Sequence, residues 1–284
     1  MKQRSPWRDG LRAFARSRTA VVGLLLAASL VIAAALASVV SPFDPLEMNM
    51  KERLSRPSPT HLLGTDQYGR DVLSRILHGT GVSLIVSFFS IAIAATVGTV
   101  VGCLSAYRGG IPDLIVAKLV DALMSFPTLI LGLLVVALLG GGVVKLTLTV
   151  SVTFLPRFVR LARGETLRIR ELQYIEAARA LGSSRLRVAL RHVMPNLLGS
   201  TLVMVALWMA AAIRIEASLS FLGFGVNPPN PTWGNMLREA VRWLSSNPWT
   251  SIFAGGAIFT AVLAFNLVGD GLRDMLAPRL RGPD

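Results

Sequence analysis

The chain alternates between long apolar stretches and shorter polar segments. A run of about 20 apolar residues is long enough for one α-helix to cross the hydrocarbon core of a bilayer. Six stretches approach this length and character: residues 19–40, 82–106, 115–139, 143–159, 197–221 and 251–268. The pattern predicts an all-α integral membrane protein with six transmembrane helices.

The first apolar stretch has a second interpretation. Ala35, Leu36 and Ala37 stand before Ser38 in the manner of a signal-peptidase site, so a cleaved signal peptide is the alternative to a permanent span. The stretch is long for a signal-peptide core, and further apolar stretches follow it. We therefore expect residues 19–40 to remain as the first transmembrane helix.

The composition agrees with a membrane protein, because 52% of the residues are hydrophobic and the mean hydropathy is +0.57. The formal net charge of +13 comes from arginines in short loops, not from one basic stripe with aromatic residues, so we expect no nucleic-acid binding. One cysteine and three scattered histidines give no disulfide and no metal site. No lysine follows a glycine-rich phosphate loop, so we expect no ATPase site and no bound cofactor in this chain.

The basic residues also predict the topology. Twenty of the 29 lysines and arginines fall on one set of alternate segments and eight on the other, while Arg214 lies within the fifth stretch. The positive-inside rule places the richer set in the cytoplasm, with both termini. We expect these segments: a cytoplasmic N-terminus 1–18, an outer loop 41–80, a five-helix core 81–273 and a cytoplasmic tail 274–284.

The richest basic segment, residues 164–195, joins the fourth and fifth stretches. Its good helix formers predict two short helices, 172–181 and 185–194. Gly182 stands where a left-handed residue would end the first helix, and Pro195 where the second would end.

Polar residues within the apolar stretches need water or a partner. Asp121 lies in the third stretch, which Pro127 should kink or break. Arg214 and Glu216 are two residues apart in the fifth stretch, so they face different sides of a helix and cannot readily pair with each other. We expect these three charged residues to border a translocation path or to meet another subunit.

The inner segment carries a recognisable motif, Glu176-Ala177-Ala178, then three residues and Gly182, and later Pro195. This motif resembles the EAA loop of the membrane subunits of binding-protein-dependent ABC importers. The resemblance implies that these five residues form a coupling loop that docks into a partner ATPase. It also implies that ATP and Mg are used by that partner and not by this chain.

Outer segments resemble the dipeptide and oligopeptide permease subfamily. Residues 61–75, HLLGTDQYGRDVLSR, match its GTDxxGRDxxSR signature, residues 223–237 match GLGxxPPxPSWGxML, and residues 269–281 are also similar. The resemblance implies a type I ABC importer permease in the bacterial inner membrane. Its implied partners are a second homologous permease subunit, two ATP-binding subunits, a periplasmic or lipid-anchored solute-binding protein and membrane lipid.

We expect Asp66, Arg70, Asp71 and Trp233 to be candidate contacts for that binding protein. Asp71 should cap a short helix on the membrane surface, and residues 233–244 should form an amphipathic helix over the outer face. The implied cargo is a dipeptide or oligopeptide, with nickel or glutathione as the alternative. An ion-coupled secondary transporter is a further, less favoured interpretation.

Overall fold

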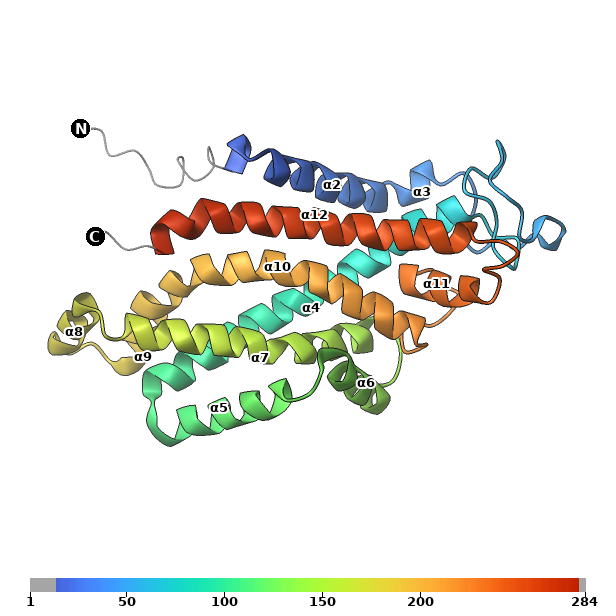
Figure 1. Ribbon diagram of the computed structural model, residues 1–284. Coiled ribbons are helices and arrows are strands. Elements are labelled where there is room, and N and C mark those ends of the chain that lie inside the picture. Colours follow the sequence, from blue (N-terminus) through green and yellow to red (C-terminus); the bar gives the residue numbers. More distant parts are fainter. Residues whose placement is uncertain (1–13, 281–284) are drawn as a thin grey trace.

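Long helices lying side by side form the body of the protein (Figure 1). The computed structural model describes the backbone of residues 14–280 and the side chains of residues 14–275. Apart from one isolated bridge between Thr65 and Asp71, the regular structure described there is helical. The helices are α2 (Arg18–Ala35), α3 (Ala37–Val40), η1 (Met50–Glu52), α4 (Val72–Arg108), α5 (Gly110–Met124), α6 (Thr128–Leu139), α7 (Val143–Ile169), α8 (Gln173–Ala180), α9 (Arg185–Val188), η2 (Ala189–Val193), α10 (Met194–Phe221), α11 (Trp233–Val241) and α12 (Trp249–Leu280).

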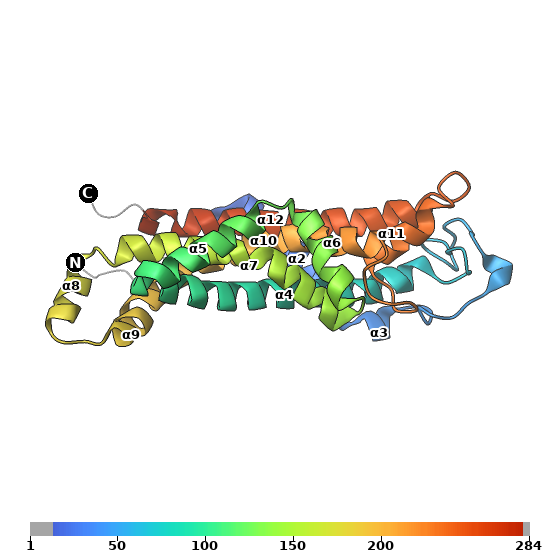
Figure 2. The same cartoon turned by 90° about the horizontal axis from the view of Figure 1, so that it is seen from below.

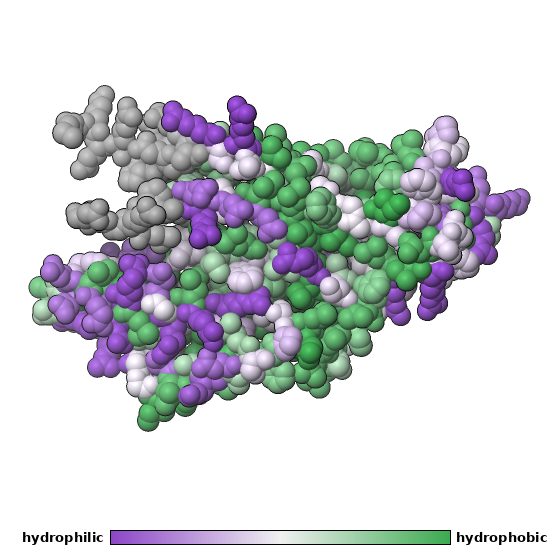
Figure 3. Space-filling view, viewed as in Figure 1, coloured by the Kyte–Doolittle hydropathy of each residue, from purple (hydrophilic) through white to green (hydrophobic). Residues whose placement is uncertain are grey.

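The bundle has an apolar middle and two polar ends (Figure 3). One end holds α8 and α9 together with the start of α2 and the end of α12, and the other holds α11 and the loop before α4 (Figures 1 and 2). Such a distribution suits a protein whose middle lies in hydrocarbon and whose ends lie in water.

The helices that could cross a membrane agree closely with the apolar pattern. Within the described residues, α2, α4, the segment Arg185–Phe221 and α12 are each long and apolar enough, and α5 with α6 qualifies as one bent span. α7 is more polar than these helices and does not qualify on apolar character alone. We count it as the sixth crossing because it packs against α4, α5, α6 and α10 and its 27 residues span about 40 Å.

The central contact of the bundle lies between α4 and α7, and glycines make it possible. A Cβ atom on Gly98 would lie 2.6 Å from the Cβ of Phe158, and one on Gly102 would lie 2.5 Å from the carbonyl oxygen of Val159. Both distances are too short for any larger residue without movement of the backbone. The small residues of the second apolar stretch therefore let these two helices meet closely.

The start of α4 differs from the prediction of a separate helix on the membrane surface. Asp71 does cap the helix, since its Oδ2 accepts a hydrogen bond of 2.8 Å from the backbone N–H of Ser74. The helix then continues without a break to Arg108, and Val72 is fully buried against Met236 of α11. The prediction was wrong because the outer loops cover these first turns, so they do not need a membrane surface.

The third apolar stretch is broken, as Pro127 led us to expect. α5 ends at Met124, α6 begins at Thr128, and the two helices are bent by 99° at the break. Pro127 has no backbone N–H and an extended ψ of 135°, which no α-helix can continue. Backbone groups in the middle of a span are thereby released from helical hydrogen bonds.

Pro195 does not end a helix, which corrects the prediction. It lies in the first turn of α10, where a missing N–H costs little, and α9, η2 and α10 follow one another directly. η2 is a π-helical turn, in which the N–H of Met194 donates to the carbonyl of Ala189. The wider turn makes room for the proline ring and keeps the inner loop continuous with the fifth span.

Candidate functional site

α8 is the exposed tip of the loop that joins α7 to α10 (Figure 1). Ile175 is fully buried and fixes the helix to the bundle, while Glu176 and Ala177 are exposed and Ala178 is half-buried. Two neighbouring positions of the predicted coupling motif thus present a small side chain and a carboxylate to solvent, where a partner can reach them.

Gly182 ends α8 in the predicted left-handed conformation, with φ of +80°. Its N–H donates to the carbonyl of Arg179 at 2.9 Å, and the N–H of Ser183 donates to the carbonyl of Ala178 at 3.2 Å. These two bonds form a Schellman motif. A Cβ on Gly182 would meet nothing within 4 Å, so its backbone conformation, and not crowding, requires glycine.

A buried cluster joins the loop to three long helices. Ile175 belongs to it with Cys103 of α4, Ala162 of α7 and Leu197 of α10. Polar contacts at its edge add to the connection, because Nε of Arg179 donates to the Tyr107 hydroxyl at 3.1 Å. Movement of α8 must therefore displace these helices or break their shared core.

The outer end is organised by a buried cluster of ion pairs. Nε of Arg70 lies 2.6 Å from Oδ2 of Asp66, and its Nη2 lies 2.6 Å from Oε2 of Glu239 on α11. Arg75 approaches the same two carboxylates at 3.4 and 3.5 Å. Two arginines and two acids thus neutralise one another and hold the first outer loop against α11.

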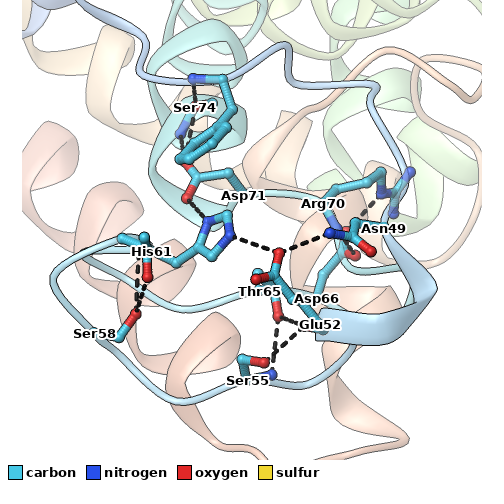
Figure 4. A network of polar contacts seen from close by, with 12 residues as sticks. Asn49, Glu52, Ser55, Ser58, His61, Thr65, Asp66, Arg70, Asp71 and Ser74 are labelled. Carbon is cyan, nitrogen blue, oxygen red and sulfur yellow. Dashed lines mark hydrogen bonds and ion pairs between the residues drawn. The ribbon is translucent and has the colours of Figure 1, made fainter.

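His61 makes a second polar network beside this cluster (Figure 4). Its Nδ1 lies 2.8 Å from Oδ1 of Asp71, and its Nε2 lies 3.3 Å from Oε2 of Glu52. Burial lowers the pKa of His61, but the hydrogen bonds and charges of Asp71 and Glu52 outweigh it and leave the pKa above its ordinary value of 6.5. Protonated His61 therefore ties the loop at Glu52 to the cap of α4.

The residues expected to contact a binding protein are buried. Asp66, Arg70, Asp71 and Trp233 are each at most 3% exposed. Their side chains support the outer loops from the interior, and none of them is part of the exposed surface. The glycines of the same motif serve the same purpose, since a Cβ on Gly69 would overlap the carbonyl of Asn49.

The three charged residues predicted as pathway or inter-subunit contacts occupy three different environments. Asp121 is exposed and pairs with Arg160 at 2.6 Å. Glu216 is fully buried and its Oε1 accepts a hydrogen bond of 2.8 Å from the Ser220 hydroxyl, whereas Arg214 faces outward from α10. The two residues do not pair, as their spacing predicts, and the structure does not bring the three together into one site.

Two functional candidates were missed in the sequence. Glu239 completes the outer cluster from 169 residues away, and nothing in its own neighbourhood indicates that partner. Arg157, near the end of the fourth apolar stretch, was counted among the cytoplasmic basic residues, yet it lies among aromatic side chains at the break between α5 and α6. Within the described residues, no group of acidic, histidine and cysteine side chains could hold a metal ion.

The fold is a multi-span helical bundle with an exposed loop around α8 at one end and a buried ion cluster at the other. Family models agree: the binding-protein-dependent transport system inner membrane component matches residues 98–282, and the N-terminal TM domain of oligopeptide transport permease C matches residues 5–57. The chain belongs to this family of inner-membrane permeases, in its peptide and nickel branch. It is a multi-pass transport component and not an enzyme.

Relatives match along nearly the whole length. A glutathione transport system permease protein of Pectobacterium atrosepticum is 41% identical over 279 residues, covering 98% of this chain and 93% of the relative. A dipeptide transport system permease protein of Alkalihalophilus pseudofirmus is 36% identical over 277 residues, covering 98% and 91%. A glutathione transport system permease protein of Escherichia coli O157:H7 is 39% identical over 280 residues, covering 98% and 92%.

Proposed function

We propose that this chain is one of two permease subunits of an ABC importer for small peptides, glutathione included. Two ATP-binding subunits dock at the end that carries α8, and a solute-binding protein delivers cargo at the end that carries α11. Similar permeases that are named for glutathione and for dipeptides support both cargoes. Membership of a binding-protein-dependent family argues against an ion-coupled secondary transporter.

The observation that carries the proposal is the contrast within α8, where Ile175 is locked into the bundle while Glu176 and Ala177 are exposed beside it. A partner that grips the exposed face can move the helix, and the buried side chain passes that movement to α4, α7 and α10. Glu176, Ala177, Ala178, Gly182 and Pro195 are in this proposal the coupling residues. The energy comes from ATP hydrolysis in the partner.

Crosslinking tests the docking surface directly. The native Cys103 is fully buried, so a cysteine placed at Ala177 offers the accessible thiol. In the assembled importer, Ala177→Cys should crosslink to an ATP-binding subunit. Leu62→Cys is the matched control, because Leu62 is 60% exposed in the first outer loop. Crosslinking of Leu62→Cys to the ATPase, or none from Ala177→Cys, would refute the proposed docking.

The same two variants test the orientation. We propose that both termini and α8 face the cytoplasm, which the distribution of lysine and arginine supports. A membrane-impermeant maleimide added to intact spheroplasts should label Leu62→Cys and spare Ala177→Cys until the membrane is opened. The reverse labelling would invert the topology.

The outer and intramembrane polar residues have more indirect parts in this proposal. The ion cluster around Asp66 and Arg70 sets the shape on which a binding protein rests. Arg214, which faces outward from α10, is placed to meet the second permease subunit or the path between the two subunits. A pathway role for Glu216 requires a rearrangement that exposes it, and uptake by Glu216→Gln tests that role.

A further inference from the structure

Three arginines follow one another at intervals of three residues along α7, and two of them are neutralised. Arg163 forms a bidentate pair with Asp113 at 2.7 and 2.8 Å, and Arg160 lies 2.6 Å from Asp121. Among the side chains described for residues 14–275, Arg157 has no carboxylate within 4.0 Å. Arg157 is therefore the one arginine of these three that has no carboxylate partner among the described side chains.

Neutral groups hold the Arg157 guanidinium in place. Its central carbon lies 4.3 Å from the ring centre of Trp208 and 4.9 Å from that of Phe154, and its Nη2 donates to the Thr128 hydroxyl at 2.5 Å. These contacts orient and attract the guanidinium, but they supply no negative charge to neutralise it. A guanidinium has five N–H donors, and the described side chains and backbone accept from one of them.

The position of Arg157 makes this charge costly. It lies 14 residues, or about 21 Å, along α7 from Val143, and 12 residues, or about 18 Å, from Ile169. It is half-buried in the middle third of a spanning helix, beside the break where α6 begins at Thr128. Charged groups inside a membrane are expensive and mark ligand or ion pathways when they persist.

We propose that Arg157 binds a carboxylate of the cargo as it passes through the membrane. This assignment rests on the proposed import of peptides and deepens it. A carboxylate can accept two parallel N–H bonds from a guanidinium, the geometry that Arg163 and Asp113 already show six residues further along α7. Dipeptides and glutathione share a free carboxylate, so one arginine serves either cargo, whereas a free nickel cation would be repelled.

The importer complex, reconstituted in proteoliposomes with its partner subunits and binding protein, tests the assignment. Uptake of dialanine is compared with uptake of dialanine amide, and uptake of glutathione with uptake of its diamide because glutathione has two carboxylates, at concentrations that saturate the binding protein with each. The same binding protein serves every variant, so its own preference cancels. Arg157→Gln should lower uptake of the acid roughly tenfold and leave uptake of the amide nearly unchanged. Lys118→Gln is the control, because it removes an exposed cation from the neighbouring α5.

Three further variants cover the case in which Arg157→Gln fails to assemble. Thr128→Asp places a carboxylate beside Arg157 and should occupy the guanidinium, so that the preference for acid over amide falls toward one. Thr128→Asn introduces a side chain of the same size without the charge, so it should keep a higher preference for acid over amide than Thr128→Asp does. Arg157→Lys keeps the charge and should retain part of the preference.

The possible results distinguish the proposed role of Arg157 from the proposed cargo. Equal loss of acid and amide uptake in Arg157→Gln would mean that Arg157 pairs with a partner subunit or supports structure, and would overturn the assignment. An unchanged preference in both Arg157→Gln and Thr128→Asp would also overturn it. If the wild-type complex imports neither dialanine nor glutathione, the proposed cargo is wrong, and the assignment falls with it.

Discussion

The guanidinium of Arg70 donates to the carboxylate of Glu239 across 2.6 Å, although the two residues are 169 positions apart in the chain. Through this bond and the matching approach of Arg75, the first outer loop and α11 become one unit. The outer surface that a binding protein would meet is therefore built from two distant segments, and each depends on the other.

Removing the Glu239 charge should destabilise that unit. Glu239→Gln leaves Arg70 and Arg75 with one acid between them in a largely buried site. We expect a loss of roughly 1–3 kcal/mol, below the value for a fully buried pair because Glu239 is 25% exposed. Thermal unfolding of the purified complex measures it. Glu47→Gln, an exposed residue of the same loop, is the control, and equal shifts in the two variants would contradict the role given to the cluster.

Gly182 should be needed for coupling and not for assembly. A residue with a Cβ pays about 1 kcal/mol or more to adopt φ of +80°, so Gly182→Val should distort the end of α8. We expect the complex to assemble and hydrolyse ATP while uptake per ATP falls. Gly199→Ala in α10 is the control, since open space surrounds that glycine too and its φ is ordinary. A normal ratio of uptake to hydrolysis in Gly182→Val would remove the coupling role.

The contact between α4 and α7 should be intolerant of one added methyl group. Gly102→Ala places a Cβ 2.5 Å from the carbonyl of Val159, and the resulting overpacking should cost about 1–3 kcal/mol. Gly164→Ala, in the same pair of helices, meets nothing within 4 Å and should be tolerated. Comparing the detergent resistance of the two purified variants tests this, and similar behaviour would show that the helices can separate freely.

His61 should make the outer loop more stable in acid than in alkali. Its pKa in the folded protein is raised above 6.5, so its contribution is fully present below that value and is lost as the pH rises through the folded pKa. The difference in melting temperature between wild type and His61→Gln should therefore be larger at pH 6 than at pH 9. His78→Gln is a suitable comparison, because Nδ1 of His78 bonds a carbonyl and no carboxylate. A difference that grows with pH would contradict the network.

The sequence predicted the spans well because all of them except α7 are long apolar runs and lipid demands internally satisfied backbone. The left-handed Gly182, the break at Pro127 and the cap at Asp71 were also predictable, since each follows from the chemistry of one residue and its neighbours.

Other features depend on contacts that adjacent residues cannot reveal. Asp66 and Trp233 looked like surface contacts and are buried, because other segments fold over them. The same holds for Val72, which the outer loops and α11 cover. Pro195 was misjudged because a single π-helical turn absorbs its ring, and no residue type announces such a turn.

The π-helical turn also limits how many residues can separate α8 from α10. Adding one residue to an α-helix rotates everything on one side of the insertion by about 100° relative to the other side. Because the π-helical turn already holds one residue more than an α-helical turn, inserting a further residue into α9 would rotate α8 relative to α10, move Ile175 out of its buried position and reorient the exposed carboxylate of Glu176, the proposed contact of an ATP-binding subunit. The number of residues between the proposed coupling residues and the fifth span is therefore constrained as strictly as the identity of any side chain.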